Sequence, residues 1–158
     1  MTGSEIPFYP KNDKRNGIMA NLLMVSDTLG WREETKCLKL MSSTASMDQL
    51  DASVQLQKYA EWCGLKIQFS LLNFCKLKNM RLPVIALLNR DTMVVVYKIS
   101  DRSIVIANPD IGLIKLTEEE YINQWIKLDI PTAGSKANMP GVIYLVARND
   151  KDARSMIH

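Results

Sequence analysis

Cysteine and histidine are the residue types that most often carry hydrolytic or metal chemistry at neutral pH, and this sequence holds few of them. Its 158 residues include three cysteines and one histidine, His158, which is the final residue. A terminal side chain is rarely held within about 3 Å of a nucleophile. Hydrolysis by a serine or cysteine normally needs such a neighbouring base. We therefore expect neither a Cys–His nor a Ser–His dyad.

The three cysteines, Cys37, Cys63 and Cys75, are widely spaced and include no Cys-x-x-Cys pair. Zinc sites require grouped cysteine and histidine ligands. Nucleotide-binding loops require Gly-x-Gly-x-x-Gly or the Walker spacing, which the seven glycines do not form. We therefore expect no metal and no cofactor, and we interpret the cysteines as buried thiols of a protein in a reducing compartment.

The composition is that of a soluble globular protein, with 47% hydrophobic residues, 23% charged residues and a formal net charge of +3. That charge is too small to indicate a nucleic-acid partner without a clustered basic face. The longest apolar runs, 82–88 and 93–97, are far shorter than the roughly 20 residues that span a bilayer. We expect neither nucleic-acid binding nor direct membrane insertion by this domain.

Helical periodicity dominates the first part of the sequence. Ile18, Leu22 and Val25 recur at helical spacing, and Gly30 follows as a stop signal. A third helix has Ser46 as its candidate cap. The predicted helices cover about 13–29, 33–41 and 46–63.

After residue 64 the pattern changes to short apolar runs separated by turns, which favours strands. Thr117 and Glu120 form a capping box that opens one further helix, over 118–126. The predicted strands cover about 65–69, 82–88, 93–99, 103–107, 113–116 and 142–147. Helices first and a meandering antiparallel sheet afterwards indicate an α+β domain.

Residues 82–125 carry the most specific pattern. They read Leu-Pro-Val-Ile-Ala-Leu-Leu, then Met-Val-Val-Val-Tyr-Lys-Ile, then Asn-Pro-Asp-Ile-Gly, then Leu-Thr-Glu-Glu-Glu with a Trp at the helix end. This order resembles the second half of the bacteriocin-processing (double-glycine leader) cysteine peptidases of bacterial ABC exporters. The resemblance implies a papain-like cysteine peptidase fold, with N-terminal helices packed on an antiparallel sheet of about six strands. It would occupy residues 13–147, between an N-terminal extension (1–12) and a polar tail or linker (148–158).

In that family a cysteine nucleophile opens the first helix. Counting back from Gly30 places this position at Gly17, whereas matching the family's glycine to Gly17 places it at Asn16. Six residues upstream, where the family keeps an oxyanion-stabilising Gln, stand Pro10 or Lys11. Neither alignment supplies a thiol.

The other two catalytic positions are also changed. The family's histidine falls at Thr92, which cannot act as a base near pH 7. The aspartate that orients the histidine falls at Asn108, still followed by Pro109. Asn can hold the turn but carries no charge to stabilise an imidazolium. The resemblance therefore implies a degenerate member that lacks the Cys, His and Asp of the triad and is not an enzyme.

This combination is similar to the peptidase-like domains of type I secretion ABC transporters. The resemblance implies a non-catalytic domain that binds the unfolded secreted protein or its leader peptide before translocation. It would lie on the cytoplasmic side of the bacterial inner membrane, beside the membrane and nucleotide-binding domains of the same exporter. The alternative is a structural or regulatory domain that contacts only the transporter, and leader-peptide cleavage is a distant third.

Three residues are candidates for substrate binding: Trp31, Thr92 and Asn108. Trp31 follows a helix stop and suits an exposed anchor, whereas Trp62 and Trp125 are expected in the core. Thr92 and Asn108 would line a vestigial cleft from adjacent strands. A free sheet edge offers another route for an extended substrate, although the sequence does not say which edge is free.

Overall fold

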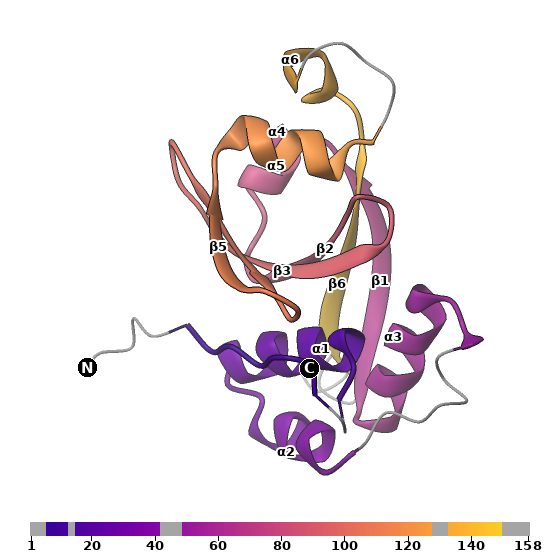
Figure 1. The fold of residues 1–158 in the computed structure, drawn as a ribbon. Coiled ribbons are helices and arrows are strands. Elements are labelled where there is room, and N and C mark those ends of the chain that lie inside the picture. Colours follow the sequence, from indigo (N-terminus) through magenta and orange to yellow (C-terminus); the bar gives the residue numbers. More distant parts are fainter. Residues whose placement is uncertain (1–5, 13–14, 42–48, 128–132, 150–158) are drawn as a thin grey trace, which may run out of the picture.

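A six-stranded antiparallel sheet forms the centre of the computed structural model, with helices on both of its faces (Figure 1). The structure describes residues 6–12, 15–41, 49–127 and 133–149. The helices are α1 (Gly17–Thr28), α2 (Arg32–Leu40), α3 (Ala52–Trp62), α4 (Phe74–Lys78), α5 (Glu118–Trp125) and α6 (Ala133–Lys136). The strands are β1 (Leu65–Leu72), β2 (Val84–Leu88), β3 (Thr92–Ile99), β4 (Ile104–Asn108), β5 (Gly112–Leu116) and β6 (Gly141–Arg148).

The predicted α+β class and the antiparallel sheet of about six strands are confirmed, but the sheet is not a simple meander. Its strand order is β1-β6-β2-β3-β4-β5, so the last strand of the chain lies between the first two. All eight residues of β6 pair with β1, from Leu72 opposite Gly141 to Leu65 opposite Arg148. The strands β1 and β5 are therefore the two edges of the sheet.

Each face of the sheet has its own hydrophobic core, because successive side chains of a strand point to opposite faces. The helices α1, α2 and α3 cover one face, where Ile85, Val95 and Tyr144 are buried. The helices α4 and α5 cover the other face, where Ala86 and Val94 are buried. The two layers of helices are visible below and above the sheet in Figure 1.

The helix boundaries differ from the predicted ones where capping decides them. The first helix begins at Gly17 and not near residue 13, because the Asn16 side chain accepts a hydrogen bond from the Met19 amide at 2.9 Å and acts as N-cap. The third helix begins at Ala52, after Asp51, and the predicted cap Ser46 lies outside the described residues. The predicted capping box of Thr117 and Glu120 is present at the start of α5.

The interpretation of the cysteines as three buried thiols is wrong. Cys37 and Cys63 form a disulfide between α2 and the end of α3, and Cys75 is exposed. Their 26-residue separation carries no sequence signal of pairing, since only the packing of the two helices brings the sulfurs together.

Two tryptophans were expected in the core, and one of them is there. Trp125, the last residue of α5, is 4% exposed and packs in the core between α5 and the sheet, as predicted. The prediction for Trp62 is wrong, because its side chain is 57% exposed. The buried stripe of α3 runs through Leu56, Tyr59 and Cys63, and Trp62 lies off that stripe.

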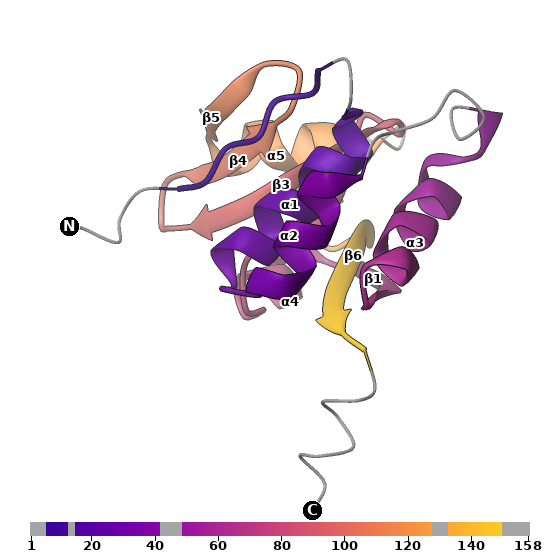
Figure 2. The ribbon, with the colours of Figure 1, turned by 90° about the horizontal axis from the view of Figure 1, so that it is seen from below.

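The N-terminal segment, residues 6–12, packs against the domain and lies beside β3 and the turn between β4 and β5 (Figure 2). The Tyr97 hydroxyl donates a hydrogen bond to the Pro7 carbonyl at 2.6 Å, and the Tyr9 hydroxyl donates one to Asp27 at 2.7 Å. Burial raises the pKa of Tyr97 to about 12, and burial and the Asp27 hydrogen bond also raise the pKa of Tyr9. Both phenols therefore stay protonated and able to donate at neutral pH.

We predict that Gly141→Ala destabilises the domain. A methyl group at Gly141 would overlap the Trp125 ring, which is 4% exposed and held by a hydrogen bond from its indole nitrogen to the Val142 carbonyl. Overpacking of this kind costs about 1–3 kcal/mol, or roughly 5 °C in Tm. Gly17→Ala is the matched control, because its methyl group would meet Pro109 at 3.7 Å, an ordinary contact. Equal melting temperatures for the two variants, measured by circular dichroism, would contradict this packing.

We also predict that stability falls as the pH rises from about 10 towards 12. The pKa of Tyr97 is near 10 in the unfolded chain and about 12 in the fold, so its contribution is intact below pH 10 and is lost as the pH passes 12. Thermal unfolding of the wild type and of Tyr97→Phe across pH 9–12 isolates this effect from lysine titration. The variant should show a shallower decline, and identical declines would exclude Tyr97 as the cause.

Candidate functional site

A pocket of about 240 Å³ lies where the N-terminus of α1 meets the sheet. We call it the cleft. It joins four elements that are far apart in the sequence, namely α1, α3, β3 and β4. Its lining residues are Asn16, Gly17, Ile18, Ala52, Gln55, Asp91, Thr92, Met93, Asn108, Pro109 and Asp110. The residues that the resemblance assigned to the triad positions, Asn16 or Gly17, Thr92 and Asn108, all line this cleft.

The α1 side of the cleft carries an amide where the resemblance places a thiol. The Asn16 amide nitrogen donates to the Gln55 Oε1 at 3.0 Å and to the Tyr59 hydroxyl at 3.3 Å. The Gln55 amide in turn donates to the Leu50 carbonyl at 2.9 Å. Gly17, the first residue of α1, adds no side chain, so this wall is a short chain of neutral hydrogen-bonding groups.

The sheet side of the cleft carries a hydroxyl and a second amide. The Thr92 hydroxyl, at the start of β3, donates to the Asp91 carboxylate at 3.0 Å. The Asn108 side-chain oxygen, at the end of β4, accepts from the Asp110 amide at 2.9 Å. Asn108 therefore holds the turn through a local side-chain hydrogen bond, as its residue type predicted.

The rim of the cleft is closed by the N-terminal segment. Lys11 forms an ion pair with Asp110 at 2.6 Å, and its backbone amide donates to the Pro109 carbonyl at 3.2 Å. The side chains of both charged residues are more than half exposed, so the pair is weak. Of the two upstream candidates, Lys11 is thus the one whose side chain reaches a cleft residue, while the Pro10 carbonyl accepts from Arg15 at 3.5 Å.

Two buried amides that sequence reasoning did not single out hold the cleft together. Asn21, fully buried in α1, donates from its amide nitrogen to the Gly17 carbonyl at 2.7 Å and to the Met93 carbonyl at 3.1 Å. It therefore connects the two walls directly. Gln55 is 6% exposed and connects α3 to Asn16. The one available signal was a polar residue at a position that helical periodicity assigns to the buried face.

The chemistry available in the cleft is hydrogen bonding and weak electrostatics. Amide groups donate and accept, the Thr92 hydroxyl does both, and Asp91 and Asp110 add negative charge. No cysteine or histidine is among the described lining residues, and Cys75 lies on α4, on the other face of the sheet. No three acidic, cysteine or histidine side chains gather into a metal-binding group in the part of the chain that the structure describes.

Trp31 lies away from the cleft. It follows α1, whereas Gly17 begins that helix, and a helix of 12 residues is about 18 Å long. Its ring is half-buried, and the Arg148 guanidinium lies over it at 5.7 Å from the centroid. Trp31 lines a separate pocket of about 430 Å³ with Gly30 and α2. The structure therefore does not join Trp31 to Thr92 and Asn108 in one surface.

An exposed apolar surface lies beside the cleft on the same face of the sheet. Phe69 and Leu71 of β1 are 53% and 55% exposed, although Phe69 contacts the buried Tyr144 edge to face. Leu71 of β1 lies opposite Val142 of β6. These two residues and Leu87 line a pocket of about 380 Å³. We call Phe69, Leu71, Leu87 and Val142 the apolar surface.

The apolar surface reaches the cleft through one pair of residues. Leu87 of β2 lies opposite Met93 of β3, and Met93 lines the cleft. Directly opposite side chains of antiparallel strands share a face of the sheet. Two exposed cations, Arg90 and Lys127, also line the 380 Å³ pocket beside the apolar surface.

No helix among the described residues has both the length and the apolar character needed to cross a bilayer. A comparison with curated protein sequences finds no match.

Three solved structures are similar in fold to this chain. A double glycine motif protease from an AMS/PCAT transporter, solved in complex with the leader peptide, is 16% identical, with a TM-score of 0.63 over 92% of this chain and 94% of that one. The peptidase domain of the Streptococcus ABC transporter ComA has the same identity and TM-score, over 92% of this chain and 100% of its own. The N-terminal peptidase C39 like domain of the toxin secretion ATP-binding protein from Vibrio parahaemolyticus is 18% identical, with a TM-score of 0.57 over 85% and 98%.

The predicted family and its papain-like fold are therefore confirmed. At these identities the structural matches establish the fold alone. The family rests on a sequence model that matches residues 6–135, most of the chain, including the N-terminal segment. This chain belongs to the Peptidase C39 family.

Proposed function

We propose that this chain is a non-catalytic peptidase-like domain of a bacterial ABC exporter of the type I secretion kind, and that it binds the secreted protein before translocation. One observation carries the proposal. The positions that would hold nucleophile, base and orienting acid meet in a single cleft, yet they present Asn16, Gly17, Thr92 and Asn108. This set can hydrogen-bond a peptide but offers neither a thiolate nor a base with a pKa near 7.

The cleft suits an extended stretch of backbone. At about 240 Å³ it is smaller than typical sites for drug-sized ligands, and its groups both donate and accept hydrogen bonds. A peptide backbone alternates the same two kinds of group. Hydrogen bonds within the protein engage the Asn16 amide nitrogen, the Thr92 hydroxyl hydrogen and the Asn108 oxygen, so a bound peptide would exchange or share them, and side-chain selectivity would come from a contact outside the cleft.

The apolar surface supplies that second contact. Phe69 and Leu71 expose more than half of their side chains beside a 380 Å³ pocket, and Leu87 leads from there to the cleft. A segment that places apolar side chains on this surface and its backbone in the cleft would use both. The relative from the AMS/PCAT transporter was solved with a leader peptide bound, which supports a peptide as the class of ligand. The partner we propose is the unfolded cargo or its leader.

In the proposed setting the domain lies on the cytoplasmic side of the inner membrane, next to the membrane and nucleotide-binding domains of its exporter. The named relatives from ABC transporters support this setting. Affinity for unfolded cargo should be modest, because ordering that chain offsets part of the contact energy.

Replacing the apolar surface should weaken cargo binding about tenfold or more. In Phe69→Ser/Leu71→Ser, two exposed apolar side chains are lost from the edge strand, and each tenfold loss corresponds to about 1.4 kcal/mol. Leu40→Ser is the matched control, because Leu40 is 79% exposed on α2 but lies outside the cleft and the apolar surface. Binding of unfolded cargo and of leader peptide is measured by calorimetry, with circular dichroism to verify folding.

Equal affinity in both variants and in the wild type would exclude the apolar surface. Absence of binding by the wild type to either ligand would count against cargo recognition altogether. If secretion also continued at the normal rate without the domain, a structural or regulatory role within the transporter would be favoured.

The wild-type chain should not cleave a double-glycine leader peptide. With no thiol or imidazole among the described cleft residues, turnover should stay at the level of the uncatalysed reaction. Mass spectrometry of the peptide after long incubation measures this, with Cys75→Ser as a control for the exposed thiol. Cleavage that iodoacetamide abolishes in the wild type would overturn the non-catalytic assignment.

A further inference from the structure

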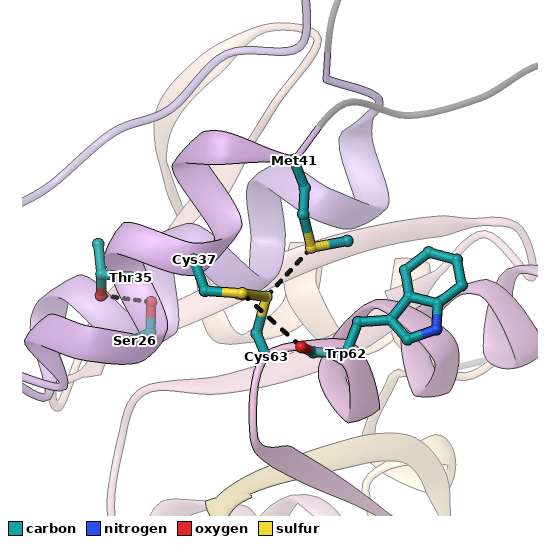
Figure 3. The surroundings of a disulfide bond; sticks show 6 residues. All are labelled: Ser26, Thr35, Cys37, Met41, Trp62 and Cys63. Atoms are coloured by element: carbon teal, nitrogen blue, oxygen red, sulfur yellow. Dashed lines mark hydrogen bonds between the residues drawn. A yellow bond between two sulfur atoms is a disulfide. The ribbon is translucent and has the colours of Figure 1, made fainter.

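The disulfide between Cys37 and Cys63 is the one covalent link between α2 and the rest of the described fold apart from the chain itself. Cys37 lies within α2, and Cys63 is the C-cap of α3 (Figure 3). Their Cα atoms are 5.6 Å apart, within the range that a disulfide bridges without backbone movement. The fold thus positions the two sulfurs for reversible bond formation.

Helix α2 buries fewer side chains than α3, and its Glu34 forms an ion pair with Arg148 of β6 at 3.3 Å. Among α2 residues only Thr35 and Leu38 are buried, and Leu38 is the single fully buried apolar side chain. The Thr35 hydroxyl donates to the Ser26 hydroxyl at 2.7 Å. Helix α3 buries four residues, and three of them, Leu56, Tyr59 and Ala60, belong to the core on that face of the sheet. Opening the disulfide should therefore loosen α2 and leave α3 in place.

The two sulfurs differ in access. Cys37 is half-buried, while Cys63 is 7% exposed and its sulfur lies 3.1 Å from the Met41 sulfur. An incoming thiolate thus reaches the Cys37 sulfur first. The Trp62 carbonyl oxygen lies 3.7 Å from the Cys37 sulfur, so the reduced Cys37 thiol has a hydrogen-bond acceptor within reach (Figure 3). The surroundings accommodate both oxidation states.

We infer that Cys37 and Cys63 form a reversible thiol–disulfide site that fastens or releases α2, with dithiol reductants and small disulfides as its reactants. In reduction, one thiolate of a dithiol attacks the Cys37 sulfur, the bond between the cysteines breaks, and Cys63 leaves as a thiolate that takes up a proton. The second thiol of the reductant then displaces Cys37, leaving two protein thiols and the oxidised dithiol. In oxidation, a disulfide such as glutathione disulfide is reduced to two thiols as the protein bond forms.

Release of α2 would change the pocket beside Trp31 and leave the cleft unchanged. The pocket beside Trp31 is built largely by α2, with Arg32, Lys36 and Lys39 as its cations. The lining of the cleft comes from α1, α3, β3, β4 and their turns, and none of it from α2. Oxidation therefore orders a basic pocket without altering the cleft.

The thiol–disulfide site does not rest on the proposed function. Whether Cys37 and Cys63 are mostly reduced or oxidised in the cell does, because the proposed function places the domain in the cytoplasm. In a cytoplasm that keeps thiols reduced, the open form would dominate and oxidation would close it.

Thiol counting and hydrogen exchange on the full chain test this inference. After equilibration with glutathione disulfide the wild type should show one titratable thiol, Cys75, and after dithiothreitol all three, reversibly over several cycles. On reduction, amides in the second half of α2 should exchange about tenfold faster or more, while those of β3 and α3 stay protected. Three thiols under oxidising conditions would overturn the inference. So would exchange in α2 that is unchanged by reduction, or equal loss of protection in β3.

Two variants distinguish the effect of the Cys37–Cys63 disulfide on α2 from a general loss of folding. Cys37→Ser/Cys63→Ser should show the α2 exchange of the reduced wild type under all conditions, with Tm lower than that of the oxidised wild type by about 5 °C or more. Cys75→Ser should behave as the wild type in both states. Redox-dependent α2 exchange in the double variant would contradict the assignment of the switch to this pair.

Discussion

The seating of α1 against the sheet is the contact on which the rest of the architecture depends. Eight consecutive residues of this helix, Met19 to Ser26, are buried, so it lies inside the domain and not on its surface. One of the eight is Asn21, whose amide connects the first turn of α1 to β3. The apolar contacts give the helix its position, and the hydrogen bond from Asn21 to the Met93 carbonyl joins its N-terminal half to the sheet. The cleft lies at this end of the helix.

Under the proposed non-catalytic function, this arrangement explains how the scaffold persists with other residues at the positions that the resemblance assigns to the triad. Asn16, Thr92 and Asn108 are each partly exposed and lie outside both cores. Their side chains satisfy local hydrogen bonds at a helix cap, a strand start and a turn. Substitution at such positions changes chemistry with little effect on packing, whereas substitution at Asn21 would remove the side-chain hydrogen bond that joins α1 to the Met93 carbonyl of β3.

Much of the fold follows from local sequence patterns, because periodicity and capping act over a few residues. The strands and the capping box at Thr117 were predictable in this way, whereas the placement of Thr92 and Asn108 in one cleft was expected only from the family resemblance. The insertion of β6 between β1 and β2 was not predictable, since it is decided by pairing between residues 69 to 83 positions apart in the sequence. The disulfide and the exposure of Trp62 also depend on how α2 and α3 pack, which no local signal encodes. The resemblance pointed to Lys11 only as one of two candidates for the oxyanion position. Its ion pair with Asp110 depends on tertiary structure and has no local sequence signal.

The edge position of β1 has a consequence for how the protein behaves in concentrated solution. Its outer side offers backbone donors and acceptors along eight residues, and Lys66 is its one charged side chain. Natural edge strands usually discourage self-association with charges, prolines or bulges. Here Phe69 and Leu71 instead expose apolar side chains on the edge strand, a combination that favours self-association through the edge. A ligand bound at the proposed apolar surface would cover these side chains and so favour the dispersed protein.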